Sequence, residues 1–257
     1  MSDMNETDIS WADYTWNPVH GCHKVSPGCR NCYAETISRR FEHTTQPWTA
    51  EHADENVQLK EHKLDAPLAD HEPGRVFVNS MSDLFHEEVP DSYITRVMEV
   101  IASVPEDVFI ILTKRPERAA RWEWYPENVW LGTSVESGDY TDRITAIAQS
   151  EASTKWVSFE PLIDSVGNVT DVLRVIDWVV VGGESGPDHR EMKHEWAREI
   201  LWQARATETA FFFKQSAAQY PERGRELELV TGEKRRIEQY PPLPDRTIDA
   251  REGGEPA

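Results

Sequence analysis

Short apolar runs recur along the chain and predict the strands of a buried sheet. They are rich in β-branched and aromatic residues and lack the alternation of a strand with one exposed face. Continuous apolar strands of this kind are typical of parallel sheets covered on both faces. The runs lie at Val76–Ser80, Val108–Thr113, Val129–Ser134, Lys155–Phe159, Trp178–Val181 and Ala210–Phe213, and a further short strand is expected at Tyr14–Pro18.

Helical patterns separate these runs, with apolar residues at every third or fourth position. Helices are predicted at Asp91–Ser103, Tyr140–Gln149 and Glu195–Ala206, and from Tyr33 to about His43. The strands begin about 20–35 residues apart, which suits βα units. We therefore expect an α/β fold, a partial or complete parallel β/α barrel of the TIM type. An open doubly wound sheet is the alternative, but no Gly-x-Gly-x-x-Gly follows the first strand, which disfavours a dinucleotide-binding fold.

A single domain is expected over residues 9–240, since 257 residues suit one large domain. Residues 1–8 are polar, and the end of the chain is rich in Pro, Gly and acidic residues. We expect disordered tails at residues 1–8 and 245–257. Between residues 44 and 74 the pattern is weakest, and Leu59–Leu68 predicts a short helix broken by Pro67.

The chain is strongly acidic, with 27 Lys and Arg against 46 Asp and Glu and a net charge of −19. An acidic coat of the kind that salt-adapted proteins have is the simplest interpretation. Non-specific DNA coating is disfavoured because it needs surplus cations, although a nucleic-acid substrate in a local basic cleft remains compatible. No apolar run of about 18 residues predicts a membrane span, and the N-terminus does not resemble a signal peptide. We expect a cytoplasmic protein.

Three cysteines lie close together in the loop 21–33, as Cys22-x6-Cys29-x2-Cys32. An odd, clustered number of cysteines differs from a disulfide framework and indicates metal binding in a reducing compartment. Three thiolates can hold three corners of an iron–sulfur cube and leave the fourth iron open to an outside ligand. The alternative is a structural zinc site with His20 or His23 as the fourth ligand. Unligated cysteines are a third interpretation.

Polar residues follow six of the predicted strands. A β/α barrel builds its site at the carboxyl ends of its strands, so we expect a shared cavity there, with ordinary polar loops as the alternative. The candidate residues are Ser82, Asp83, Lys114, Arg115, Ser134, Glu136, Glu160, Gly182, Gly183, Glu184, Lys214 and Gln215.

Several of these candidates also have a purely structural interpretation. Lys114 and Arg115 predict a clamp for a carboxylate or phosphate, or else a solvated turn. Glu160 and Lys214 would form a buried ion pair without further function. The two glycines after the strand at 178–181 would allow a ligand close to the backbone, or simply make a tight turn.

Several sequence blocks together resemble a known group of proteins. In order they read WNPVHGC, SPGCRNCYAE, VNSMSDLFHE, LTKRPER, LGTSVES, SFEPL, VGGESG and FFFKQ. Over about residues 9–240 they resemble an uncharacterised phage-type family with a three-cysteine motif. That family is similar to divergent radical S-adenosylmethionine (radical SAM) enzymes.

The radical SAM resemblance implies a partial β/α barrel with a [4Fe–4S] cluster at its mouth. Cys22, Cys29 and Cys32 would bind the cluster, with a first gap of six residues where the usual gap is three. The open iron would bind S-adenosylmethionine, and an electron from a donor protein would break a carbon–sulfur bond. The resulting 5′-deoxyadenosyl radical would abstract hydrogen from a substrate, while the protein supplies orientation and excludes water.

By position, the resemblance assigns roles to further residues. Ser82 and Asp83 would contact the cofactor's amino group, and Ser134 and Glu136 its ribose. The family's Gly-Gly-Glu follows the second strand, whereas Gly182, Gly183 and Glu184 follow a later one, so these three are candidate cofactor contacts without a fixed role. The residues expected to line the catalytic cavity are Lys114, Arg115, Glu160, Lys214 and Gln215.

We therefore expect a radical SAM-like enzyme whose substrate the sequence does not name; a nucleotide or nucleic acid is one candidate. One alternative is a zinc-stabilised hydrolase or nuclease with an acidic metal site at Asp83, Glu136 and Glu160. Another is a non-catalytic binding module in which the cysteine loop is structural. The expected partners are a small-molecule cofactor and an electron-donor protein, with no membrane, and the oligomeric state stays open.

Overall fold

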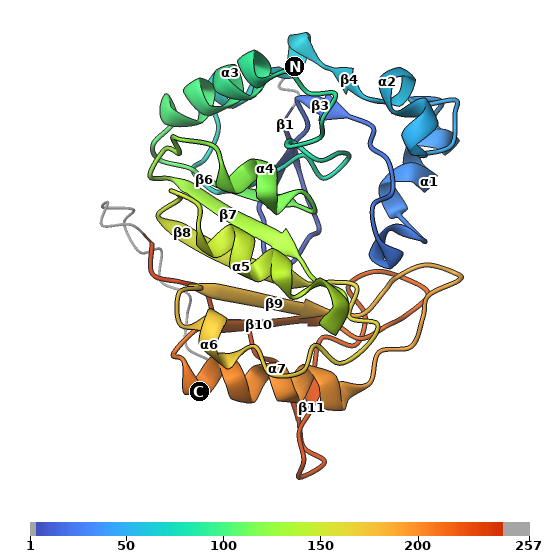
Figure 1. Cartoon of the computed structure of the whole chain (residues 1–257), viewed down its shortest axis with the longest axis vertical. Coiled ribbons are helices and arrows are strands. Elements are labelled where there is room, and N and C mark those ends of the chain that lie inside the picture. The colour runs from blue at the N-terminus through green and yellow to red at the C-terminus, as the bar shows by residue number, and fades with distance from the viewer. Residues whose placement is uncertain (1–3, 244–257) are drawn as a thin grey trace.

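A mostly parallel sheet of eight strands forms the centre of the protein, for which a computed structural model describes residues 4–243 (Figure 1). Its strand order is β1-β2-β5-β6-β7-β8-β9-β10, and only β1 is antiparallel to its neighbour. The strands are β1 (Met4–Glu6), β2 (Tyr14–Trp16), β5 (Arg75–Val78), β6 (Val108–Thr113), β7 (Val129–Ser134), β8 (Thr154–Phe159), β9 (Trp178–Gly182) and β10 (Ala210–Gln215). The predicted α/β class and its parallel strands are thus confirmed.

The sheet does not close into a barrel within residues 4–243, because β1 and β10 remain its two edges. The edge of β10 is instead used by the C-terminal segment. Phe213 N–H donates to Ile237 O (2.8 Å), and Gln239 N–H donates to Phe211 O (3.0 Å). Farther along the segment, the Tyr240 hydroxyl donates to Ser10 O (3.2 Å). The C-terminal segment therefore occupies the edge that a closing strand would need.

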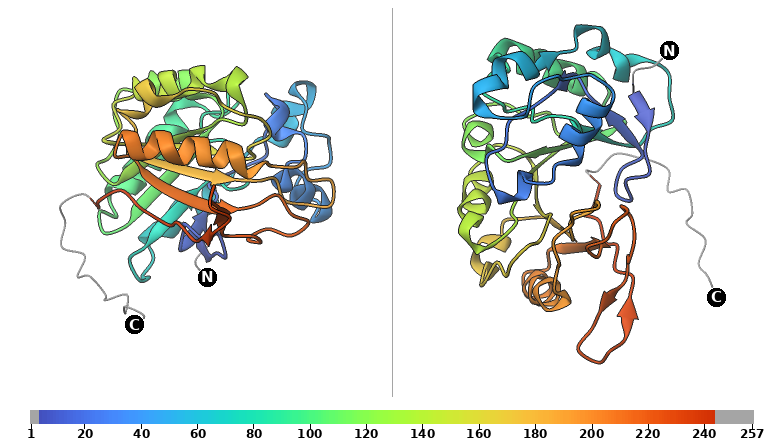
Figure 2. Two further views of the ribbon diagram at one scale, coloured as in Figure 1. Left: turned by 90° about the horizontal axis from the view of Figure 1, so that it is seen from below. Right: turned by 90° about the vertical axis from the view of Figure 1, so that its right-hand side faces the viewer.

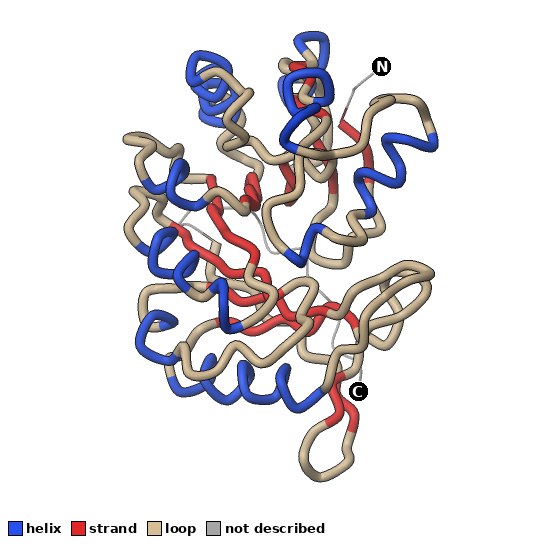
Figure 3. Tube along the Cα trace, turned by 45° about the vertical axis from the view of Figure 1, so that its right-hand side comes forward, coloured by secondary structure: helices blue, strands red, loops and turns tan. Residues whose placement is uncertain are grey.

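Helices cover one face of the sheet and strands occupy the centre of the molecule (Figures 1 and 3). The helices are α1 (Tyr33–Arg40), α2 (Ala53–Asn56), α3 (Asp91–Ala102), α4 (Pro116–Ala120), α5 (Asp142–Ala148), α6 (Thr170–Leu173) and α7 (His194–Ala206). Short 3₁₀ turns are η1 (Pro27–Cys29), η2 (Ala50–His52), η3 (Glu61–Lys63), η4 (Ala66–Leu68) and η5 (Gly138–Tyr140). Two small sheets pair β3 (Val19–His20) with β4 (Gln58–Leu59), and β11 (Leu227–Glu228) with β12 (Lys234–Arg235); the latter hairpin projects from the body (Figure 2).

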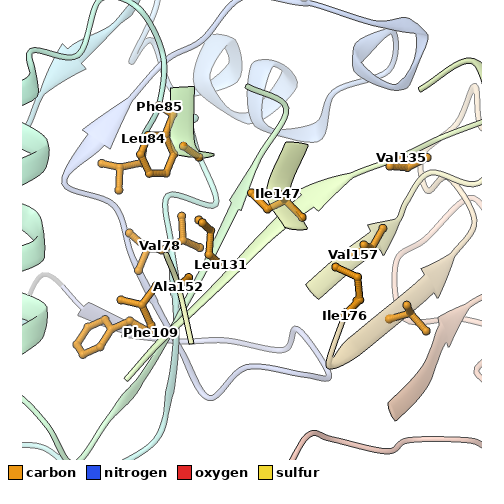
Figure 4. Packing of buried hydrophobic residues seen from close by; sticks show 14 of the residues in the cluster. Val78, Leu84, Phe85, Phe109, Leu131, Val135, Ile147, Ala152, Val157 and Ile176 are labelled. Carbon is orange, nitrogen blue, oxygen red and sulfur yellow. The ribbon is translucent and has the colours of Figure 1, made fainter. Parts of the chain in front are cut away.

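Successive side chains of the central strands enter two different cores, because neighbouring residues of a strand point to opposite faces. Phe109 and Leu131 belong to the larger core together with Ile147 of α5 (Figure 4). The opposite face carries a second core rich in tryptophan, made by Trp11, Phe77, Val108, Ile110, Trp130, Trp156, Trp178, Val180 and Phe212. Burial on both faces explains why these strands are continuously apolar in the sequence.

Two expectations for the irregular regions are wrong. Residues 4–6 belong to the expected disordered tail, but they form β1, and Met4 is buried in the larger core. The helix expected over Leu59–Leu68 is replaced by the end of β4 and the separate turns η3 and η4.

Residues 245–257 lie outside the described part of the chain. No helix within residues 4–243 is long and apolar enough to cross a membrane.

Gly132 on β7 lies directly against the ring of Trp156 on the neighbouring β8. A Cβ at position 132 would be 2.4 Å from Nε1 and Cε2 of that ring. The ring cannot move aside easily, because its Nε1–H lies 3.2 Å from the carbonyl oxygens of both Ile111 and Trp130. This contact couples three adjacent strands through one side chain.

We expect Gly132→Ala to lower the free energy of unfolding by about 1–3 kcal/mol, because the added methyl group overpacks the tryptophan core. Urea denaturation followed by tryptophan fluorescence measures the change. Gly138→Ala is the milder control, since its Cβ would make one slightly tight contact, 3.3 Å from Ser165 O, and should lower the stability less. Equal stability of Gly132→Ala and the wild-type protein would contradict the packing described.

Candidate functional site

A cavity of about 150 Å³ lies at the carboxyl ends of β5, β6 and β7 and contains all three cysteines in its wall. In Figure 1 the arrowheads of β7 and β9 point toward the side of the molecule where α1 lies. Of the candidate residues, the cavity brings together Cys22, Cys29, Cys32, Ser82, Asp83, Lys114, Arg115 and Ser134. The shared cavity expected from the strand ends is therefore present for the first half of the sheet.

The cysteine loop begins at a glycine that no other residue could replace. Gly21 has a φ of 86°, and a Cβ there would lie 1.9 Å from Asn56 O. Its N–H donates to Met81 O (3.0 Å), so the loop starts against the segment that follows β5. The loop then passes through η1 and ends where α1 begins at Tyr33. Cys22 is thus placed beside the strand ends by backbone contacts.

Glu136, which follows β7, holds the middle of the cysteine loop. Its Oε1 accepts a hydrogen bond from Gly28 N–H (3.0 Å), and its Oε2 pairs with Arg143 Nη1 (3.0 Å). The carboxyl group is completely buried, so these two partners replace its hydration. A Cβ at position 28 would be 3.0 Å from the carboxyl carbon, so the loop backbone packs directly on the carboxylate. Glu136 therefore positions the loop between Cys22 and Cys29.

Glu184, which follows β9, holds the next part of the loop. Its Oε2 accepts hydrogen bonds from Asn31 Nδ2 (3.0 Å) and from Arg190 N (2.9 Å) and Nε (2.9 Å), and its Oε1 pairs with Arg190 Nη2. Arg190 Nη1 in turn donates to Pro27 O (3.0 Å). Burial alone would raise the pKa of Glu184, but the Arg190 groups and the Asn31 amide lower it below its usual value.

Asp83 organises the cationic wall of the cavity. Its Oδ1 accepts hydrogen bonds from Phe85 N–H (3.0 Å) and the Thr113 hydroxyl (2.7 Å). Its Oδ2 accepts from Lys114 N–H (2.9 Å) and Arg115 Nη1 (3.2 Å). Both oxygens are therefore occupied by the protein itself. Asp83 acts on the cavity by fixing its neighbours rather than by offering a free carboxylate.

Arg115 lies between this carboxylate and the first cysteine. Its Nη1 is 3.6 Å from Cys22 Sγ, and its Nε pairs with Glu87 Oε2 (2.9 Å). Burial raises the pKa of the Cys22 thiol to about 12, although the Arg115 charge opposes this. Burial also raises the pKa of Cys32. The two thiols therefore need a bound cation to lose their protons near neutral pH.

His23 and His86 form a chain of hydrogen bonds beside Cys22. Glu88 N–H donates to His86 Nδ1 (3.1 Å), so the proton of a neutral His86 is on Nε2, which lies 2.9 Å from His23 Nδ1. His23 Nε2 then faces Glu87 Oε1 (3.4 Å). Burial and the Arg115 charge lower the pKa of His86 to about 4, so this ring is neutral near pH 7. The chain fixes the orientation of His23 next to the cysteine.

Lys114 supplies a positive charge inside the cavity. It forms no ion pair within residues 4–243, and its charge acts on Cys32. Tyr33 closes the same side, with its hydroxyl donating to Ser80 O (2.6 Å). Burial of its hydroxyl end raises the pKa of this phenol, and Cys32 and Glu160 act in the same direction, so the hydroxyl stays protonated although part of the ring is exposed.

The remaining candidates lie outside the cavity wall. Glu160 Oε1 pairs with Lys214 Nζ (3.2 Å), and this carboxylate lies over Gly182, where a Cβ would be 2.3 Å away. Gln215 is buried; its Nε2 donates to Gly183 O (2.9 Å), and its Oε1 accepts a hydrogen bond from Glu222 N–H (2.6 Å). A Cβ at Gly183 would be 2.2 Å from Ala217 N, so this glycine allows two backbone segments to pack.

The acidic metal site of the zinc alternative is not assembled. Asp83, Glu136 and Glu160 each pair with a different cation, Arg115, Arg143 and Lys214. Within residues 4–243, the group whose ligand atoms all lie within 4.8 Å of one another is His23, His86 and Glu87. His20 does not line the cavity, and burial lowers its pKa to about 4.

The sequence did not single out several residues that build the site. His86, Glu87, Asn31 and Arg190 hold the loop or its neighbours in place, as described above. His86 and Glu87 lie in the block SDLFHE and Asn31 in the block CRNCY, so the blocks included them without indicating a role. Arg190 lies outside every block, and nothing in its local sequence indicates its contact with the distant Pro27.

Comparison with known proteins connects the chain to one family. A family model described as a protein of unknown function (DUF5131) matches residues 6–241. The match spans the sheet, the cysteine loop and the C-terminal segment that follows β10. Neither the curated proteins nor the solved structures contain a match to the chain.

We expect Glu184→Gln to lower the free energy of unfolding by about 1–3 kcal/mol, because it removes a charge bonded to Arg190. The folded-state pKa of Glu184 is lowered from 4.5. Its contribution is therefore complete above the unfolded-state value and disappears as the pH falls through the lowered pKa. Urea denaturation between about pH 3 and 7 measures how the difference between the variant and the wild type changes.

Glu233→Gln is the control for this prediction, since Glu233 forms an exposed pair with Arg235 (2.7 Å) that contributes little. A difference between Glu184→Gln and the wild type that grows toward acid pH would contradict the role given to Glu184.

Proposed function

We propose that the chain, which belongs to the DUF5131 family of proteins of unknown function, is an iron–sulfur enzyme of the radical SAM kind. Cys22, Cys29 and Cys32 would hold a [4Fe–4S] cluster, and one iron would stay open to S-adenosylmethionine. The observation that carries the proposal is that three thiols share one cavity with two cationic residues, Lys114 and Arg115, at the carboxyl ends of parallel strands.

The spacing of the sulfur atoms disfavours a single metal ion held by all three cysteines. The three Sγ atoms do not all lie within 4.8 Å of one another. Two thiolates bound to one zinc ion at about 2.3 Å can be at most about 4.6 Å apart. A cubane binds each cysteine through a different iron and therefore accepts a wider separation. The donor set also fits, since thiolates are the usual ligands of such clusters.

The number of ligands favours an open coordination position. The chain has three cysteines, so no fourth cysteine can close the cluster. His23 is the histidine in the cavity wall, and its two ring nitrogens face His86 and Glu87. The fourth iron would therefore be free for an exogenous ligand.

The charges of the cavity suit an anionic cluster and a ligand that carries a carboxylate. Arg115 is next to Cys22, and Asp83 and Glu87 hold it there. Lys114 has no ion-pair partner in the described structure and would bind the carboxylate of S-adenosylmethionine. The cluster, when bound, would supply the electron that cleaves this cofactor, and an electron-donor protein would be required as a partner.

The remaining residues of the cavity would bind and orient the cofactor and exclude water. Ser82 donates its hydroxyl to Val19 O (2.8 Å) and keeps its lone pairs for a ligand, such as the cofactor's amino group. Ser134 would contact the ribose. Trp48, Phe77 and Leu112 provide an apolar part of the wall, which limits the access of water to a reactive species.

We expect Cys22→Ala, Cys29→Ala and Cys32→Ala each to lose iron and acid-labile sulfide, because each removes one of three cluster ligands. His20→Gln and His23→Gln are the controls and should retain both. Anaerobic reconstitution followed by metal and sulfide analysis measures this, and a reductant-dependent release of 5′-deoxyadenosine should follow the iron content. A wild-type protein that contains stoichiometric zinc and loses it in His23→Gln would contradict the proposal.

A further inference from the structure

The segment that carries the cysteines has a positive charge within an acidic chain. Residues 22–43 contain four basic residues (Lys and Arg) and two acidic residues (both Glu). The whole chain has 27 Lys and Arg and 46 Asp and Glu. Lys24, Arg30, Arg39 and Arg40 are all exposed. Lys24 pairs with Glu35 (2.8 Å), while the three arginines form no ion pair within the described residues. A local cationic surface therefore exists beside the cavity.

The helix α1 and the residue that follows it expose apolar side chains on a face that adjoins Arg40. Tyr33, Ile37 and Phe41 are 49%, 39% and 61% exposed and follow one another at intervals of four residues. They lie about 6 Å apart along the helix and share one face. The Arg40 guanidinium lies 5.7 Å from the centre of the Phe41 ring. Two aromatic rings are thus presented to solvent, and the Phe41 ring lies beside Arg40, which forms no ion pair within the described residues.

This surface is continuous with the cavity. Lys24 and Tyr33 belong to the surface, and both also line the cavity. The hydrogen bond from the Tyr33 hydroxyl to Ser80 O fixes the ring, so that its exposed side is a rigid platform. An open hollow is lined by Lys24, Glu35, Thr36, Arg39 and Arg40, and Lys24 is the residue that it shares with the cavity. A long ligand on α1 would therefore extend directly into the cavity.

We propose that the surface formed by Lys24, Arg30, Tyr33, Arg39, Arg40 and Phe41 binds a single-stranded nucleic acid and delivers one nucleotide to the cavity. The inference rests on the proposed function, because it names the substrate class of that same cavity. Arginines bind phosphates, and aromatic faces stack on unpaired bases with little dependence on sequence. The combination of unpaired arginines with exposed rings fits a strand of nucleotides, whose charge is also opposite to that of the surface.

The acidic remainder of the chain would repel a polyanion, so binding must be local and sensitive to salt. For a single strand, each phosphate contact changes the slope of log K against log salt concentration by about −0.7. Stacking on Phe41 does not involve a counterion and should leave this slope unchanged. The charged and aromatic contributions are therefore separable by experiment.

The test is a fluorescence-anisotropy titration of labelled single-stranded RNA and DNA of about 16 nucleotides with the anaerobically reconstituted protein. We expect Arg39→Gln/Arg40→Gln to bind about tenfold or more weakly, with a salt slope smaller by about 1.4. Phe41→Ala should bind about tenfold more weakly with the wild-type slope. The control Trp202→Ala/Arg205→Gln, which alters an exposed aromatic and arginine on α7, should bind as the wild type does.

Equal binding by the wild type and Arg39→Gln/Arg40→Gln would overturn the inference, as would a wild-type protein that binds no oligonucleotide at low salt. If instead Phe41→Ala slows reduction of the iron site by a small acidic redox protein while no oligonucleotide binds, the surface serves the electron donor and the inference is wrong. Iron content separates the two proposals. An iron-free protein that binds oligonucleotides through Arg39 and Arg40 supports the surface and rejects the iron–sulfur function.

Discussion

Two buried carboxylates fix the part of the loop that carries Cys29 and Cys32, while the backbone contacts of Gly21 place Cys22. The loop between β3 and α1 has little regular structure, and it is held against the sheet by Glu136 at Gly28 and by Glu184 at Asn31 and, through Arg190, at Pro27. Glu136 pairs with Arg143, and Glu184 pairs with Arg190. Neither buried carboxylate is therefore left without a compensating positive charge. The sheet ends thus act as a rigid template onto which an irregular loop is fixed, and the arrangement of the three thiols follows from that template.

The same pairing explains the electrostatic character of the cavity in so acidic a protein. Asp83 is satisfied by backbone N–H groups, a hydroxyl and Arg115, so it contributes no free negative charge to the wall. Lys114 remains without an ion-pair partner in the described structure, and Arg115 lies against Cys22. A site that neutralises its own carboxylates while leaving cations available is suited to an anionic cluster or an anionic ligand. The net charge of −19 alone would have indicated a protein that repels anionic ligands.

The pattern of hydrophobic residues predicted the strands well. It did not predict the open edge of the sheet or the orientation of two carboxylates, which depend on contacts between residues distant in sequence. The strands at 108–113 and 129–134 form with the predicted bounds, because burial on both faces makes a strand apolar throughout. Closure of the barrel was not predictable, since it depends on whether the C-terminal segment or another strand occupies the edge of β10. The cavity gathers Ser82, Lys114 and Ser134 as strand ends predict, but pattern could not show that Glu136 and Glu184 turn toward the loop backbone. That choice depends on Gly28 and Asn31, which are distant in sequence from the two carboxylates.

The central claim, that three cysteines hold a cubane with one iron open, is tested most directly by Mössbauer spectroscopy of the reconstituted, iron-57-enriched protein. We predict a [4Fe–4S] spectrum in which one iron differs from the other three and shifts when S-adenosylmethionine is added. A cluster whose four irons are equivalent and unaffected by S-adenosylmethionine would contradict the account, as would the absence of any cluster spectrum.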